Sequence, residues 1–160
     1  MTSERSGVVK TFRYVPLLQM VSFKDAVVPD RFVGAPATLD AMFGFDADPY
    51  SQDWELERAD ASRLTEFLAA YDTPALTDDD RFALMALCIA SAHDAFDGGT
   101  LTDDQWSRIC SILIADCELH AFTIHNWCCP DATCDDEMHT LTPKMRDVWT
   151  AAFDSRPRGT

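Results

Sequence analysis

The sequence TDDDRFALMALCIASAHDAFDGG, from Thr77 to Gly99, indicates the fold class of this chain. Thr77 is a favourable N-cap residue, and three aspartates fill the first turn, where the helix dipole favours negative charge. Apolar residues then recur at three- and four-residue spacing and also fall between those positions, which predicts a helix buried on several sides. The glycine pair predicts its end. The stretch therefore indicates a central helix in a mainly α-helical protein.

Helical patterns of the same kind lie on both sides of this stretch. One helix is expected over 60–71, and another after Thr102, where TDDQ forms a capping box with Gln105. The second of these helices is expected to bury a stripe that extends to His120, and the pattern continues or restarts beyond it. A last helix is expected to begin at Thr142 as its cap, with a proline in the first helical position.

We expect one compact, helical bundle-like domain over residues 53–154. The 160 residues fit a single domain, and 47% hydrophobic residues are enough to build a core. Residues 1–52 contain four prolines in a mixed sequence, so we expect an irregular N-terminal segment that packs on the body and has room for short strands. Residues 155–160 are expected to form a loose tail.

The chain carries 27 acidic residues against 13 basic ones, a formal net charge of −14. Residues 41–160 hold 23 of the acids and eight of the bases, so the imbalance lies in the helical part. Such a surface repels phosphate backbones and anionic lipids, which disfavours direct nucleic-acid binding and membrane docking. A basic protein partner is favoured instead. The alternative interpretation is a solvated surface that only keeps the protein soluble.

The motifs of common enzyme classes do not occur in the sequence, so we expect a non-catalytic protein without a cofactor. Asp116 and His120 would share one face of a helix and could orient an imidazole for base catalysis, but a histidine bonded to its helix neighbour explains the same spacing. Neither a signal-peptide pattern nor an apolar run long enough for a membrane helix is seen, which favours a cytoplasmic protein with reduced thiols.

Metal-binding residue types gather in HNWCCPDATCDDEMH, from His125 to His139. His125, Cys129, Cys134 and His139 supply the nitrogen and sulfur ligands that zinc prefers, and His120 is a further candidate. The spacing lacks a CxxC pair, and a surface loop explains the same residues. A small zinc-binding protein or enzyme, or a Cys129–Cys134 disulfide, is therefore an alternative.

Acidic residues gather in several places that could contact a basic partner. Some lie at predicted helix starts, where capping explains part of them, and others lie in a loop, which is a common place for recognition. Trp54, in an acidic stretch, is expected to be the most exposed of the four tryptophans. The candidate partner-binding residues are Asp78, Asp79, Asp80, Asp103, Asp104, Asp131, Asp135, Asp136, Glu137 and Trp54.

Four short patterns mark the helical part: Phe82-Ala-Leu-Met85, Trp106-x2-Ile109-x3-Leu113-x2-Asp116-x2-Leu119-His120, Ile124-x2-Trp127, and Leu141-Thr142-Pro143-x2-Arg146. Over residues 77–150 this set resembles the immunity proteins of bacterial polymorphic toxin systems. The resemblance implies a cytoplasmic, non-catalytic inhibitor whose acidic face covers the basic active site of a toxin. A phage-type nucleic-acid mimic that inhibits a defence protein is the alternative that the same acidic surface supports.

Overall fold

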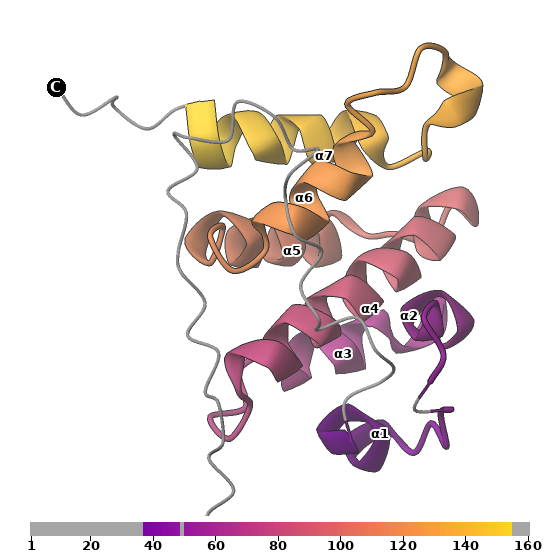
Figure 1. Ribbon diagram of the computed structural model, residues 1–160, viewed down its shortest axis with the longest axis vertical. Coiled ribbons are helices and arrows are strands. Elements are labelled where there is room, and N and C mark those ends of the chain that lie inside the picture. The colour runs from indigo at the N-terminus through magenta and orange to yellow at the C-terminus, as the bar shows by residue number, and fades with distance from the viewer. Residues whose placement is uncertain (1–36, 49, 155–160) are drawn as a thin grey trace, which may run out of the picture.

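The computed structural model describes residues 37–48 and 50–154, and this part of the chain is mainly α-helical with no strand (Figure 1). A turn of 3-10 helix, Ala61–Arg63, leads into α3, another, Asp135–Glu137, lies between α6 and α7, and the π-helical turn Thr150–Asp154 follows α7. The α-helices are α1 (Ala37–Phe43), α2 (Trp54–Glu57), α3 (Leu64–Ala70), α4 (Asp78–Asp97), α5 (Asp103–Ala115), α6 (Ala121–Cys128) and α7 (Thr142–Trp149).

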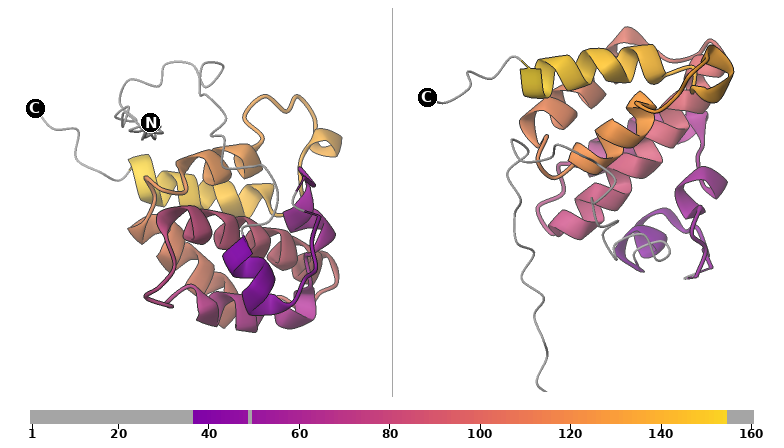
Figure 2. Two further views of the ribbon diagram at one scale, coloured as in Figure 1. Left: turned by 60° about the horizontal axis from the view of Figure 1, so that its bottom comes forward. Right: turned by 45° about the horizontal axis from the view of Figure 1, so that its top comes forward.

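Helix α4 is the centre of the fold, as its sequence predicts. The Asp80 amide donates to Thr77 Oγ1 at 3.1 Å, and the Thr77 amide donates to Asp80 Oδ2 at 3.0 Å, which forms a capping box. Every residue from Phe82 to Ala92 is buried, because α1, α2, α3 and α5 all pack against this helix (Figure 2). Gly99, with a φ of +70°, follows the helix in the left-handed conformation that glycine adopts without strain.

Helices α5, α6 and α7 complete the core. The predicted capping box of α5 is confirmed, since the Gln105 amide donates to Thr102 Oγ1 at 3.2 Å and the Thr102 amide donates to Gln105 Oε1 at 3.0 Å. Helices α6 and α7 pack on each other, and Arg146 Nε donates to the Cys128 carbonyl at 3.0 Å. This bond satisfies a carbonyl at the end of α6 that has no partner within its own helix.

Two predicted helix boundaries are wrong. Helix α5 ends at Ala115, and residues 116–120 form a turn before α6, so the end of the stripe expected on one helix, His120 included, lies in that turn. Thr142 lies inside α7 rather than capping it. Its hydroxyl is buried and donates to the Trp127 carbonyl at 3.0 Å, which satisfies a donor and an acceptor that would otherwise lack partners in the core.

The helical body begins earlier than predicted. Helix α1 lies within the segment expected to be irregular, and Leu39 and Phe43 on it belong to the hydrophobic core. Residues 1–36 of the segment that had room for short strands, and residues 155–160 of the expected loose tail, lie outside the described residues.

The prediction that Trp54 is the most exposed tryptophan is also wrong, because its side chain is only 2% exposed. It lies on α2, which packs against α4, while its neighbour Leu56 points outward and is 56% exposed. A one-turn helix shows too few residues for periodicity to reveal which side faces the core.

Candidate functional site

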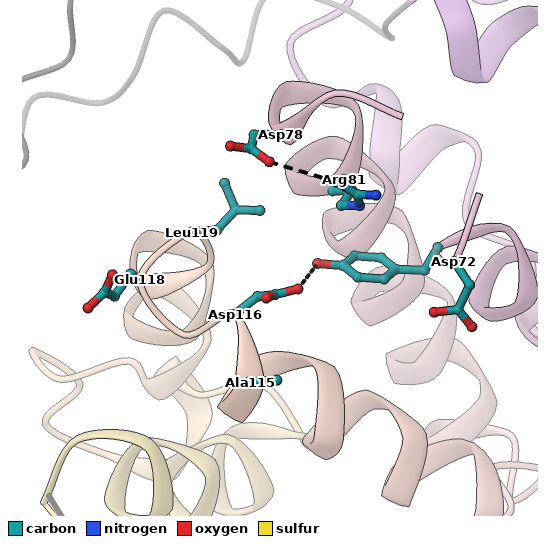
Figure 3. Close-up of a pocket in the computed structure, with 8 residues that line it drawn as sticks. Asp72, Asp78, Arg81, Ala115, Asp116, Glu118 and Leu119 are labelled. Atoms are coloured by element: carbon teal, nitrogen blue, oxygen red, sulfur yellow. Dashed lines mark hydrogen bonds and ion pairs between the residues drawn. The ribbon is translucent and has the colours of Figure 1, made fainter. Parts of the chain in front are cut away.

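A pocket of about 620 Å³ opens beside the first turn of α4 (Figure 3). Its walls come from three segments: the end of α3, the start of α4, and the turn between α5 and α6. Four of the lining side chains are carboxylates and one is a guanidinium, so the pocket carries an excess of negative charge. The lining residues are Tyr71, Asp72, Asp78, Arg81, Ala115, Asp116, Glu118 and Leu119.

Helix ends place these carboxylates around the pocket. Tyr71 is the C-cap residue of α3, with Asp72 directly after it, and Asp116 is the C-cap residue of α5. Asp78 is the first residue of α4, directly after the Thr77 N-cap. Because three helix ends meet here, carboxylates distant in the sequence come close together in space.

A chain of hydrogen bonds that begins in the core holds Asp116, which is exposed. Tyr71 Oη lies 2.8 Å from Asp116 Oδ2 and 2.7 Å from His120 Nε2. An ionised carboxylate can only accept, so the Tyr71 hydroxyl donates to Asp116, and its oxygen then accepts from a proton on His120 Nε2. The His120 ring is 0% exposed and stacks on Phe82 at a centroid distance of 6.3 Å. The direction of the chain is therefore from His120 through Tyr71 to Asp116.

Burial keeps both inner groups of this chain neutral. It lowers the pKa of His120 from 6.5 to about 4, with the Asp116 charge opposing the shift. Burial, followed by the hydrogen bond to Asp116, raises the pKa of the Tyr71 hydroxyl well above its ordinary value. His120 Nδ1 is also buried and has no hydrogen-bond partner within the described residues. Since His120 has no access to solvent, this arrangement orients the Asp116 carboxylate rather than exposing a base to a substrate.

Arginines partly balance two of the other carboxylates. Arg108 places one guanidinium nitrogen 2.7 Å from each carboxylate oxygen of Asp72. Arg81 lies 3.9 Å from Asp78, a looser ion pair. The pocket therefore keeps a net negative charge that a cationic group can approach from solvent.

The sequence-predicted acidic residues lie in two groups rather than on one face. Asp78 and Asp79 are exposed at the start of α4, whereas Asp80 is 7% exposed and its carboxylate closes the capping box. Helix α4 has 20 residues, so its ends are about 30 Å apart. The second group lies toward the far end, which the α6–α7 segment reaches through a Thr140–Asp97 hydrogen bond. Its members are Asp103, Asp104, Asp131, Asp135, Asp136 and Glu137.

Sequence reasoning missed three of the pocket carboxylates as a binding feature. Asp72 and Glu118 stand alone in the sequence, and Asp116 was considered only as the partner of a catalytic histidine. The sequence pattern around these three residues indicates a binding site only weakly, because each is a single acidic residue at a helix end or in a turn.

The four candidate zinc ligands of the alternative interpretation are not brought together. Within the described residues, no three His, Cys, Asp or Glu side chains are placed to hold a metal ion. Cys134 is exposed, His139 lies against the Trp127 ring, and His125 faces Trp149 at a centroid distance of 5.8 Å. All six cysteines are free thiols, so the alternative Cys129–Cys134 disulfide is not formed. A second pocket of about 450 Å³ at this segment includes Asp131 and Glu137.

No family model, no curated protein and no solved structure matches this chain. Among the helices of residues 37–48 and 50–154, none combines the length and the apolar character needed to cross a bilayer.

Proposed function

We propose that this protein is an acidic, non-catalytic binding protein that neutralises a basic protein partner. The pocket at the start of α4 carries the proposal, because it gathers four carboxylates from three segments into one concavity. Asp116 is held in place from the buried side through Tyr71. A carboxylate that is already oriented loses little freedom when a partner binds, which favours affinity.

The group that fits this pocket is a cationic side chain of the partner. An arginine can form paired hydrogen bonds with a carboxylate, and a lysine can donate to several oxygens at once. The net charge of −14 extends the attraction beyond the pocket, since complementary fields speed the encounter of two proteins.

The partner class that agrees best with these features is a toxin domain with a basic active-site cleft, for example a nuclease. The protein would then be a bacterial immunity protein that acts in the cytoplasm. The support is the resemblance of residues 77–150 to such inhibitors, together with the acidic pocket. A basic defence protein as partner would instead make the chain a nucleic-acid mimic.

Two variants with the same change of charge test this proposal. The pocket variant is Asp72→Asn, Asp78→Asn and Glu118→Gln, and the control is Asp103→Asn, Asp104→Asn and Asp135→Asn at the far end of α4. Each protein is used to capture partners from a lysate of the source organism at low salt, with mass spectrometry to identify them. We expect the pocket variant to capture at least about tenfold less of a basic protein than the wild type does, and the control variant to capture as much as the wild type.

An equal loss in both variants would mean that only total charge matters, which contradicts the role of the pocket. Capture of a toxin supports inhibition, and co-expression should then show protection by the wild type and not by the pocket variant. Capture of a defence nuclease or polymerase would replace the immunity function with nucleic-acid mimicry.

A further inference from the structure

The last turns of α4 take part in a cluster of ionisable and aromatic side chains that the proposed function does not use. The His93 and His139 rings are 5.6 Å apart, and the Trp127 ring lies 5.4 Å from His93 and 4.4 Å from His139. His93 belongs to α4, Trp127 to α6, and His139 to the segment between α6 and α7. The cluster therefore joins three elements at one point.

Residues 130–140, here called the acidic segment, lie beside the end of α4 (Figures 1 and 2). The Thr140 hydroxyl donates to Asp97 Oδ1, and the His139 ring covers part of Trp127, which is only 7% exposed. The hydrogen bonds of residues 130–138 described by the structure stay within the segment or reach Cys129. The acidic segment therefore contacts the end of α4 through the ring of His139, which faces His93, and through the hydrogen bond of Thr140 to Asp97.

The two histidines have different neighbours. His93 Nε2 lies 3.5 Å from Asp97 Oδ2 and His93 Nδ1 lies 3.8 Å from Asp94 Oδ1, so a protonated His93 has carboxylates to pair with. His139 has no recorded ion pair within the described residues, and its ring faces His93 and Trp127. Helix α7 contributes a further positive charge near this end of α4, Lys144, whose Nζ lies 5.7 Å from the Phe96 ring.

A second proton in this cluster is therefore unfavourable while the segment is docked. Two imidazolium rings would face each other at 5.6 Å, and His139 would be partly desolvated against Trp127. Burial and the nearby His93 lower the pKa of His139 from its usual value of 6.5. A segment that leaves α4 allows water to solvate the His139 charge.

We propose that the acidic segment is a proton-sensitive arm, docked on α4 while His139 is neutral and released when both His93 and His139 are protonated. Release frees the segment that carries Asp131, Asp135, Asp136 and Glu137 from the body. The device does not depend on the pocket at the other end of α4.

Nuclear magnetic resonance of the uniformly 15N-labelled full chain tests the proposal between about pH 8 and pH 5, the range in which histidines titrate. In the wild type we expect His139 to titrate below 6.5. The amides of residues 130–140 and the Trp127 indole should move toward unstructured positions with the same midpoint. As the pH is lowered, the ratio of molecules with a docked segment to molecules with a released one should fall. The fall is up to tenfold for each pH unit by which docking lowers the pKa of His139.

Three variants separate the arm from general effects of acid. His139→Phe keeps a ring against Trp127 but cannot be protonated, so its segment should stay docked. His93→Gln removes the facing charge and should raise the pKa of His139 toward 6.5. His125→Gln removes the other histidine that interacts with the segment, because the Asp131 charge opposes the burial that lowers the pKa of His125, and release should persist in this variant if His93 and His139 control it.

Three results would overturn the proposal. The first is titration of His139 at or above 6.5, which would mean that attraction between its charge and the Trp127 ring is stronger than the repulsion. The second is an unchanged response in His139→Phe. The third is a transition in which the amides of α5 move together with the segment, because that would be global unfolding.

Discussion

Replacing Tyr71 by phenylalanine should destabilise the protein by about 2–4 kcal/mol at neutral pH. The Tyr71 side chain is 5% exposed, and its hydroxyl is the only hydrogen-bond partner recorded for the His120 ring in the described residues. Without it, a buried imidazole N–H is left unpartnered, which costs about 1–3 kcal/mol. The bond to the Asp116 carboxylate is lost as well, worth about 1.5–3 kcal/mol, and water recovers part of that because Asp116 is exposed.

Urea unfolding followed by circular dichroism measures this change as a shift of midpoint at constant slope. Tyr50→Phe is the matched control, because it removes the same hydroxyl from a side chain that is 80% exposed, and it should change stability by less than about 0.5 kcal/mol. If Tyr71→Phe costs no more than Tyr50→Phe, the chain from His120 to Asp116 does not stabilise the fold and our reasoning is refuted.

Three further predictions concern stability. The pKa of His120 is about 4 in the folded protein and 6.5 when unperturbed, so the neutral ring adds up to about 3 kcal/mol to the free energy of unfolding above pH 6.5, and this is lost as the pH falls toward 4. Urea midpoints across this range should therefore fall less in His120→Phe than in the wild type. Thr102→Ala removes the N-cap of α5 and should cost about 1 kcal/mol, measured as a lower thermal midpoint, with Thr73→Ala, in the turn between α3 and α4, as the comparison. Trp54→Ala should cost about 3–5 kcal/mol in urea unfolding, and a loss below about 1 kcal/mol would contradict its place in the core.

Local chemistry made the main helices predictable. The capping boxes at Thr77 and Thr102 each need only residues three positions apart, and Gly99 after α4 needs only a left-handed backbone conformation. The apolar pattern of α4 indicated burial on several sides, which the structure confirms.

Tertiary contacts decided the features that were predicted wrongly. Trp54 is buried because α2 packs on α4. Thr142 is buried because its hydroxyl donates to the Trp127 carbonyl in the core. Asp116 and His120 meet through Tyr71 across a turn, a residue 45 positions from Asp116 in the chain. A local pattern holds no information about such a partner.

The sequence by itself determined the helical class, the starts of α4 and α5 and the excess of negative charge, since each depends on residue type or on neighbours within one or two turns. Only the tertiary structure decided where the negative charge becomes a site. Asp72, Asp78 and Asp116 lie at the ends of three different helices, and the pocket exists because packing on α4 brings those ends together. The order of residues along a chain does not determine which helix ends meet, because that depends on how all the apolar faces are buried at once.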